Sequence, residues 1–380
     1  MKWLRWLGLP VGIAILLAMT LKLELGGALH MIAQAGYALL LLIPLHALPL
    51  LLDAQGWRVL LDGRASLAFL WWVATVREAV NRLLPVAGIG GEVIGIRLAQ
   101  WRVPDGSAVA ASVIVEVVVT LAVQYVFSAI GVVLIVASSQ RGDGWMAIVL
   151  GLVLSLPVPA TVVVLMRRGG IFVTIERFAK RLFGASNPIL QRIDGKRLDV
   201  DIDALMLRTG VLLRAFLWQL AGYVLGALET WLALKLLGHP VSVGGAVAIE
   251  AITQAVRHAA FFVPAGLGVQ EAAVVLLARL FGVDHNAAIS LALVKRMREV
   301  SFGCLSLLSW QCAEVWRRVD QHRASQRGAD ERSAEPRGAQ QRSSDQHRAV
   351  ERRADEPRVE GGGRTAAERV KPAKAVASER

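Results

Sequence analysis

Apolar residues occur along the chain in long blocks separated by short polar connections. Six blocks, at roughly 6–21, 35–53, 107–138, 145–166, 211–237 and 286–310, are long enough, or nearly so, to cross a hydrocarbon core of about 30 Å as helix. Two further segments, 66–104 and 240–284, mix short apolar runs with Pro, Gly and charged residues. The pattern predicts an all-α polytopic membrane protein with about six full spans and two segments of a different kind.

The basic residues between the blocks predict how these spans are oriented. Nine Lys and Arg residues lie in the polar stretch 167–208, and others flank the first and last blocks. The positive-inside rule therefore places this basic loop and both termini in the cytoplasm. With this topology, 66–104 must begin and end on the inside and 240–284 on the outside.

Short apolar runs joined by Pro and Gly are typical of half-helices that enter a membrane and return. We therefore expect 66–104 and 240–284 to form re-entrant hairpins. Paired, tilted full spans are the alternative.

The two unusual segments share a sequence motif. Pro85 precedes Glu92 by seven residues, and Pro264 precedes Glu271 by seven, with a Gly-x-Gly between in each case. The same register later aligns Glu116 with Lys295. Combined with the topology, it predicts an inverted repeat of units 35–138 and 211–310, related by a pseudo-two-fold axis in the membrane plane. Many transporters are built in this way.

Charged residues at membrane depth mark a candidate site, because each costs roughly 2.5–3.5 kcal/mol on insertion scales unless it faces a cavity or a partner. The last block holds three cations and Glu299, which leaves positive charge for an anionic group or for acidic partners such as Glu116. Glycines in the hairpins are expected to leave backbone N–H groups free and to aim helix N-termini inward. The candidate lipid-binding residues are Arg77, Asn81, Pro85, Gly88, Gly90, Glu92, Glu116, Arg257, Pro264, Gly266, Gly268, Glu271, Lys295, Arg296, Arg298 and Glu299.

Composition supports the membrane interpretation. The chain is 55% hydrophobic and 19% charged, which exceeds the apolar share of an ordinary soluble domain. An extracellular disulfide domain, a coiled coil and a nucleic-acid binder are excluded as interpretations of the whole chain. The final segment, 320–380, holds few large apolar residues but 14 Lys and Arg and 11 Asp and Glu, so we expect a disordered cytoplasmic tail after a membrane domain at 1–319.

Signals for catalysis are weak. No Gly-x-Ser-x-Gly elbow, His-Glu-x-x-His pair or Walker A motif is present in the sequence, and no Cys/His cluster has metal-ligand spacing. We expect no cofactor and no metal, and the chain is interpreted as a protein that is not an enzyme.

The stretch 262–271, Phe-Val-Pro-Ala-Gly-Leu-Gly-Val-Gln-Glu, is followed by Leu-Val-Lys-Arg-Met-Arg at 293–298 and Ser-Trp-Gln at 309–311. These residues resemble the hopanoid-biosynthesis-associated membrane proteins, within the superfamily of the lysylphosphatidylglycerol synthase transmembrane (flippase-like) region. The resemblance covers about residues 5–315. It implies a bacterial inner-membrane protein that handles or translocates lipid, with hopanoid-biosynthesis enzymes as candidate partners. The aminoacyl-transferase domain of the synthases has no counterpart after residue 320.

The leading hypothesis is a flippase-like transporter or accessory factor for a hopanoid, another polyisoprenoid or an anionic phospholipid. The polar head of this lipid would lie near Glu92, Glu271, Arg296 and Arg298. One alternative is an intramembrane enzyme or assembly subunit of hopanoid synthesis that uses Glu92 and Glu271 as acid and base. Another is a scaffold whose tail recruits cytosolic enzymes.

Overall fold

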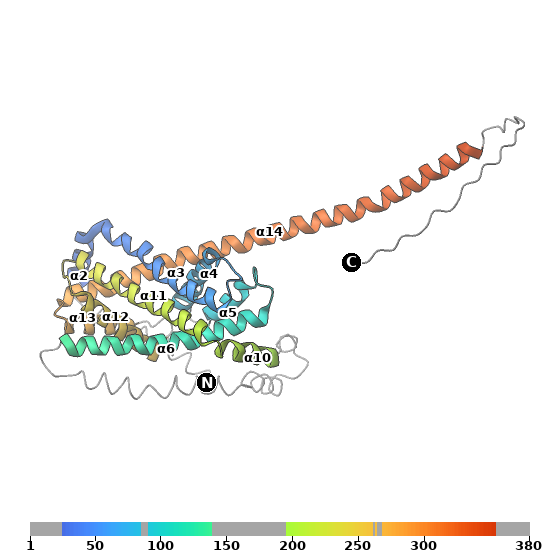
Figure 1. The fold of residues 1–380 in the computed structure, drawn as a ribbon. Helices are drawn as coiled ribbons and strands as arrows, with labels where there is room; N and C mark the ends of the chain where they lie inside the picture. Colours follow the sequence, from blue (N-terminus) through green and yellow to red (C-terminus); the bar gives the residue numbers. More distant parts are fainter. Residues whose placement is uncertain (1–24, 85–89, 139–194, 261–262, 264–267, 355–380) are drawn as a thin grey trace, which may run out of the picture. The chain divides into compact units, whose positions relative to one another are not determined.

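The computed structural model describes residues 25–84, 90–138, 195–260, 263 and 268–354. These residues form α-helices and one short 3-10 helix, and no β-strand occurs among them (Figure 1), so the prediction of an all-α protein is confirmed. The predicted spans 6–21 and 145–166 and most of the basic loop 167–208 lie outside the described residues. The count of six spans therefore stays a prediction.

The chain divides into two compact units, Met1–Cys312 and Ala313–Arg380. The described helices are α2 (Leu25–Ala35), η1 (Gly36–Leu41), α3 (Leu42–Leu60), α4 (Leu67–Leu83), α5 (Gly90–Ala99), α6 (Gly106–Ser138), α10 (Gly195–Met206), α11 (Thr209–Leu236), α12 (Val243–Ala259), α13 (Val269–Leu280) and α14 (His285–Ala354).

Three helical stretches are long and apolar enough to cross a membrane: Gly27–Leu60, Gly106–Ala137 and Thr209–Leu236. They contain or closely match the predicted spans 35–53, 107–138 and 211–237. The predicted span 286–310 is helical as the first part of α14, but it carries a cluster of charged residues and its crossing of a membrane stays a prediction.

Helix boundaries follow the register of the predicted repeat. Helix α3 ends at Leu60 and α11 at Leu236, an offset of 176 residues. Helices α4 and α12 both contain 17 residues, and their first and last residues are related by that same offset. Each of these two helices also begins after a serine, Ser66 or Ser242, whose hydroxyl accepts a hydrogen bond from a backbone N–H of the first turn.

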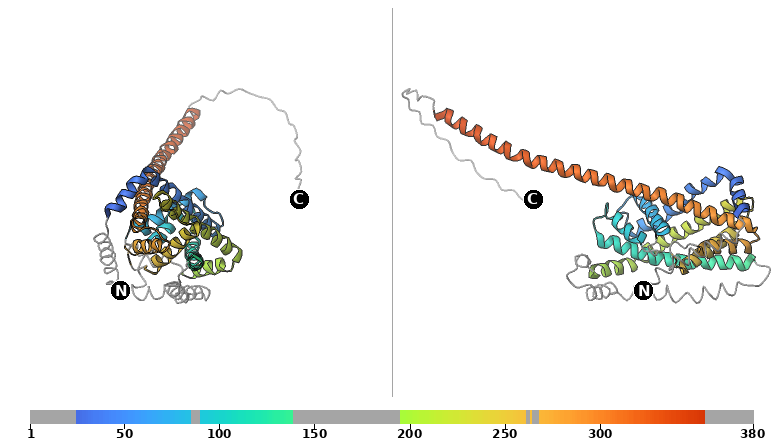
Figure 2. Two further views of the ribbon diagram at one scale, coloured as in Figure 1. Left: turned by 90° about the vertical axis from the view of Figure 1, so that its left-hand side faces the viewer. Right: turned by 180° about the vertical axis from the view of Figure 1, so that it is seen from behind.

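The second half of each unit keeps a slightly different register. Helices α5 and α13 begin at Gly90 and Val269, and α6 and α14 begin at Gly106 and His285, so both offsets are 179 residues. Helix α6 runs in the opposite direction to the first part of α14, and α3 runs opposite to α11 (Figures 1 and 2). The equivalent helices are therefore arranged as an inverted repeat requires.

Each predicted hairpin contains one longer and one shorter helix. Helix α5 has 10 residues and α13 has 12, which correspond to about 15–18 Å, or roughly half of a hydrocarbon core. Most of the residues that connect α4 to α5, and most of those that connect α12 to α13, lie outside the described residues. The choice between re-entrant hairpins and paired full spans thus stays a prediction.

Close packing between helices depends on small residues. A Cβ atom added to Gly91 would lie 2.4 Å from the backbone oxygen of Arg77, so α5 approaches α4 too closely for any side chain at this position. Helix α3 crosses α11 near Gly222, where an added Cβ atom would lie 3.1 Å from the backbone oxygen of Pro49. Such contacts are typical of helices that associate in membranes.

The second unit contains the rest of α14, from residue 313 to Ala354. This differs from the expectation of a disordered tail, because 320–354 continue as helix. The stretch is rich in Ala, Arg, Glu and Gln, which have high helix propensity and place opposite charges within one or two turns. The remaining tail residues, 355–380, lie outside the described residues.

Candidate functional site

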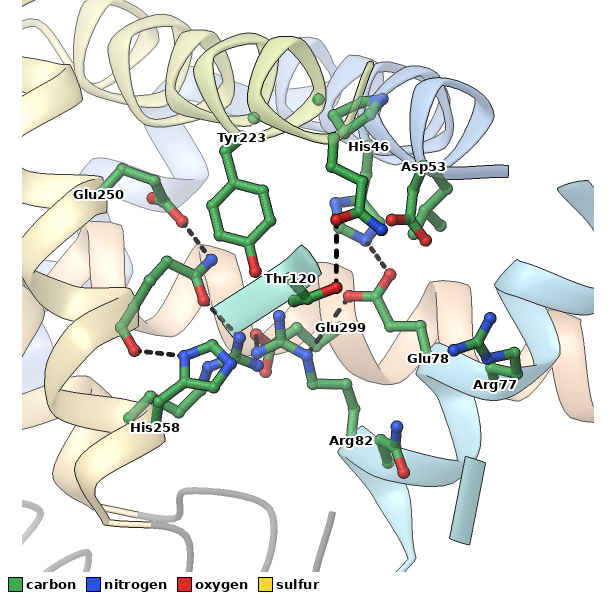
Figure 3. Close-up of a pocket in the computed structure, with 18 of the residues that line it drawn as sticks. His46, Asp53, Arg77, Glu78, Arg82, Thr120, Tyr223, Glu250, His258 and Glu299 are labelled. Carbon is green, nitrogen blue, oxygen red and sulfur yellow. Dashed lines mark hydrogen bonds and ion pairs between the residues drawn. The ribbon is translucent and has the colours of Figure 1, made fainter. Parts of the chain in front are cut away.

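A cavity of about 640 Å³ lies between helices of both repeat units in the first compact unit (Figure 3). Helices α3, α4, α5, α6, α11, α12, α13 and α14 all contribute to its lining. Seven carboxylates and five cationic side chains face it, together with two histidines. The ionisable lining residues are Asp53, Glu78, Glu92, Glu116, Glu229, Glu250, Glu299, Arg77, Arg82, Arg257, Lys295, Arg298, His46 and His258.

In the first repeat unit, Arg77 joins the two carboxylates of the neighbouring helices. Its Nη1 donates to both carboxylate oxygens of Glu116 at 3.0 and 2.8 Å, and its Nε donates to Glu92 at 2.9 Å. Asn81 donates to Glu92 at 3.2 Å, and the Arg77 guanidinium lies 4.8 Å from the ring centre of Trp57. The sequence motif residue Glu92 is therefore held by α4, and α4, α5 and α6 are tied together at this point.

In the second repeat unit, Lys295 contacts the carboxylate of Glu250 on α12 and donates to the hydroxyl of Thr230 at 2.9 Å. The Thr230 hydroxyl donates to Glu250 at 2.7 Å, and Gln254 donates to the other Glu250 oxygen at 2.8 Å. The lysine has two polar partners, and its carboxylate has three.

The other motif carboxylate, Glu271, lies on α13 and pairs with Arg296 of α14. It accepts from Arg296 Nε at 2.7 Å and from the backbone N–H of Gly268 at 2.8 Å. Arg296 also lies 3.0 Å from Glu299, one turn further along α14. Gly268 has a φ of 77°, a conformation that favours glycine, and it precedes the first residue of α13.

A chain of ion pairs joins the two repeat units across the cavity. Arg82 donates to Glu299 at 3.0 Å and lies 3.3 Å from Glu78, which in turn lies 3.2 Å from His46. His46 contacts Glu229 at 3.1 Å, and Glu229 lies 2.9 Å from Arg298. Figure 3 shows His46, Glu78, Arg82 and Glu299 around one side of this cavity. The chain links α3, α4, α11 and α14 through charge-assisted contacts.

Three features correct expectations from the sequence. The cations of α14 do not leave an uncompensated positive charge, because α11, α12 and α13 supply Glu229, Glu250 and Glu271 to them. Glu116 pairs with Arg77 of its own repeat unit rather than with Lys295. Each of these four pairs joins two different helices, so the spacing of the residues along one helix could not predict which carboxylate meets which cation.

The third correction concerns the backbone N–H groups of the hairpins. The N–H of Gly268 is bound by Glu271, and the N–H of Gly91 is bound by the Asn81 side chain at 2.8 Å. These two N–H groups are therefore bound within the protein and are not available for an anionic ligand.

The structure brings most of the predicted site residues to one place. Eight of them line the cavity: Arg77, Asn81, Glu92, Glu116, Arg257, Lys295, Arg298 and Glu299. Glu271 and Arg296 pair with each other beside Glu299, and Gly90 and Gly268 lie at the starts of α5 and α13. Pro85, Gly88, Pro264 and Gly266 lie outside the described residues.

Seven ionisable residues that line the cavity are not among the sixteen candidate residues predicted from the sequence: His46, Asp53, Glu78, Arg82, Glu229, Glu250 and His258. His46 and Asp53 are isolated polar residues within or at the end of an apolar block. The rule that singled out the charges of α14, that an ionisable residue inside a span needs a polar partner, applies to them equally. Among the described residues, no group of three or more His, Cys, Asp and Glu is arranged to hold a metal ion.

An all-helical domain with helices able to cross a membrane and an interior rich in ion pairs defines an integral membrane protein with a polar internal site. The family described as the lysylphosphatidylglycerol synthase TM region matches residues 5–305. This match covers most of the chain, and the chain belongs to that family. No curated protein and no solved structure matches it significantly.

Proposed function

We propose that this protein moves a polar-headed lipid between the two leaflets of a membrane, as a flippase-like transporter. The observation that carries the proposal is a cavity of about 640 Å³ lined by charged side chains from both repeat units. A polar head cannot cross hydrocarbon cheaply because it loses its hydrogen bonds to water. Charged and polar groups within the protein can replace those bonds on the way across.

Apolar side chains on the outside of the helices support the same proposal. Leu213 and Leu217 on α11, Leu276 on α13 and Leu305 on α14 are all exposed. An apolar exterior suits contact with acyl chains, whereas the charged cavity suits the head of the same molecule. A lipid combines these two chemical properties.

Alternating access is the mechanism that the inverted repeat favours. Two equivalent units can pack against each other in two ways, and each way opens a central site to a different side. The ion pair between Arg82 and Glu299 joins α4 of the first repeat unit to α14 of the second. The pair between Arg298 and Glu229 joins α14 to α11. Opening the cavity would require such pairs to separate or to exchange partners.

The cargo and location are narrower parts of this proposal. Residues 262–311 resemble hopanoid-biosynthesis-associated proteins, which supports a hopanoid or another polyisoprenoid as cargo. The ionic lining of the cavity supports a phospholipid. We place the protein in a bacterial inner membrane with both termini in the cytoplasm, on the basis of the basic residues in 167–208.

The experiment is a leaflet-exchange assay with purified protein in liposomes. Fluorescent phospholipid in the outer leaflet is quenched by dithionite, and the fraction that becomes accessible over time measures exchange. We expect wild-type protein to accelerate exchange and Glu299→Gln to slow it at least tenfold. Asp62→Asn, which changes an exposed carboxylate in the turn after α3, is the matched control and should retain the wild-type rate. Exchange equal to that of protein-free liposomes would refute the proposed function.

A further inference from the structure

Two charged side chains of the cavity remain after its ion pairs are assigned. Four of the five cations contact carboxylates that also line it, and six of the seven carboxylates are used in these contacts. The pairs are Arg77 with Glu92 and Glu116, Arg82 with Glu78 and Glu299, Lys295 with Glu250, and Arg298 with Glu229. Among the described residues, one lining cation, Arg257, and one lining carboxylate, Asp53, have no ion-pair partner.

Arg257 lies in the last turn of α12 and faces the cavity. Its guanidinium contacts the side-chain oxygen of Gln254, and it forms no ion pair with a carboxylate in the part of the chain that the structure describes. Gln254 is itself fixed by its hydrogen bond to Glu250. A guanidinium has five N–H donors, so Arg257 has several donors left for an anionic ligand.

Asp53 lies on α3 and also faces the cavity. Its carboxylate makes no hydrogen bond or ion pair with any other described residue. In Figure 3, Asp53 lies on the opposite side of the view from His258, the sequence neighbour of Arg257, with Tyr223 and Thr120 between them. An isolated carboxylate at this depth needs a cation or a proton as partner.

Further polar groups without partners lie in the lining of the same cavity. The hydroxyl of Thr253 and the side-chain amide nitrogen of Gln219 are buried and have no hydrogen-bond partner among the described residues. Buried polar groups are normally hydrogen-bonded, so each of these atoms has a hydrogen bond to offer to water or to a polar ligand in the cavity. Thr253 lies on α12 and Gln219 on α11, whereas Asp53 lies on α3, so the polar groups without partners come from three helices around the cavity.

We propose that the cavity binds a zwitterionic phospholipid headgroup, with its phosphate at Arg257 and its primary ammonium at Asp53. One unpaired charge of each sign matches a head that carries one charge of each sign. A head with phosphate alone would leave Asp53 without a partner, and a head with ammonium alone would leave Arg257 without one. This assignment rests on the proposed function, because it names the substrate class of the transporter.

The binding test uses purified full-length protein in detergent and short-chain lipids as probes. Dihexanoyl phosphatidylethanolamine carries both groups, and dihexanoyl phosphatidylglycerol carries the phosphate without an amine. We expect the ethanolamine lipid to bind at least tenfold more tightly, since it gains a charge-assisted hydrogen bond to Asp53. Soluble glycerophosphoethanolamine should bind much more weakly than the lipid, and equal binding of the two would overturn a lipid as the ligand.

The variants separate the two subsites. Asp53→Asn should remove the preference for ethanolamine and leave binding of phosphatidylglycerol unchanged, whereas Arg257→Gln should weaken both lipids about tenfold. Neither substitution breaks an ion pair, so both variants are expected to fold. Asp62→Asn and Arg64→Gln are matched controls in the exposed turn after α3 and should bind like wild type.

The outcomes distinguish this assignment from the proposed function. If Asp53→Asn slows the exchange of lipid between leaflets equally for every headgroup, the assignment of the headgroup site is overturned and the transport function is not. Selective binding that depends on both residues, without any exchange between leaflets, would uphold the headgroup site and refute transport. Equal affinity of wild-type protein for both lipids would overturn the assignment directly.

Discussion

Arg77 is the side chain whose loss we expect to cost the most stability. It is 8% exposed and holds the carboxylates of Glu92 and Glu116, whose side chains are 23% and 2% exposed. Arg77→Met keeps much of the length of the side chain but removes its charge. Breaking a buried ion pair in this way typically costs 3–5 kcal/mol, because the remaining charge has neither partner nor water.

The exposure of each carboxylate decides where in this range the effect falls. Glu92 can recover part of its hydration, whereas Glu116 cannot. We therefore expect Arg77→Met to lower the free energy of unfolding by about 4 kcal/mol. The measurement is reversible unfolding of the purified protein in mixed micelles of mild detergent and SDS. Arg102→Met is the control: Arg102 is exposed and lies 5.9 Å from the ring centre of Phe69, so its loss should cost less than about 1 kcal/mol.

A second substitution tests whether unpaired charge is the cause. Glu116→Gln in the Arg77→Met background removes the carboxylate that cannot reach water, and it should restore about half of the lost stability. A loss below about 1 kcal/mol for Arg77→Met would refute the argument. So would a double variant that is no more stable than the single one, because the loss would then come from packing rather than charge.

Three further predictions concern packing, pH and topology. Gly91→Ala places a Cβ atom 2.4 Å from a backbone oxygen of α4 and should cost about 1–3 kcal/mol in the same unfolding assay, whereas Gly210→Ala, with no atom within 4 Å, should not destabilise. Hydrogen bonds from Arg208 hold the pKa of Asp62 below the ordinary value of 3.8, so this pair stabilises the protein fully above about pH 4 and progressively less as pH falls through the lowered pKa. The melting temperatures of wild type and Asp62→Asn should therefore differ at pH 7 and approach each other as the pH falls below 3.8, and a difference that does not change with pH would contradict this. With the two native cysteines replaced, Ser66→Cys and Ser242→Cys should react with a membrane-impermeant thiol reagent from opposite sides, and labelling from one side would exclude the inverted topology.

The helical elements and their repeat were largely predictable from the sequence. Long apolar blocks predict helices by length and composition, and the Pro and Glu spacing that relates Pro85–Glu92 to Pro264–Glu271 appears in the structure as matching starts of α5 and α13. Such features are local, because each depends on residues close together in the chain.

The ion pairs of the cavity were not predictable in the same way. His46 and Glu229 are 183 residues apart, and Arg82 and Glu299 are 217 apart. Nothing local in the sequence indicates which carboxylate meets which cation once eight helices pack around a cavity. The residues on α14 were found because four charges within five positions are conspicuous, whereas Asp53 is a single charge at the end of an apolar block. Its importance depends on its having no partner, which only the packing reveals.

The lengths of two equivalent connections differ between the repeat units, and this difference would bear on the energy of the proposed transport. Six residues separate α4 from α5, but nine separate α12 from α13. If the two units were identical, the conformation open to one side and the conformation open to the other would have equal free energies. Three additional residues at one connection are one difference that removes this equality, so a transporter of the proposed kind would favour one side of the membrane before any lipid or energy source acts on it. Lipid exchange by such a protein would have an intrinsic sidedness in its rate.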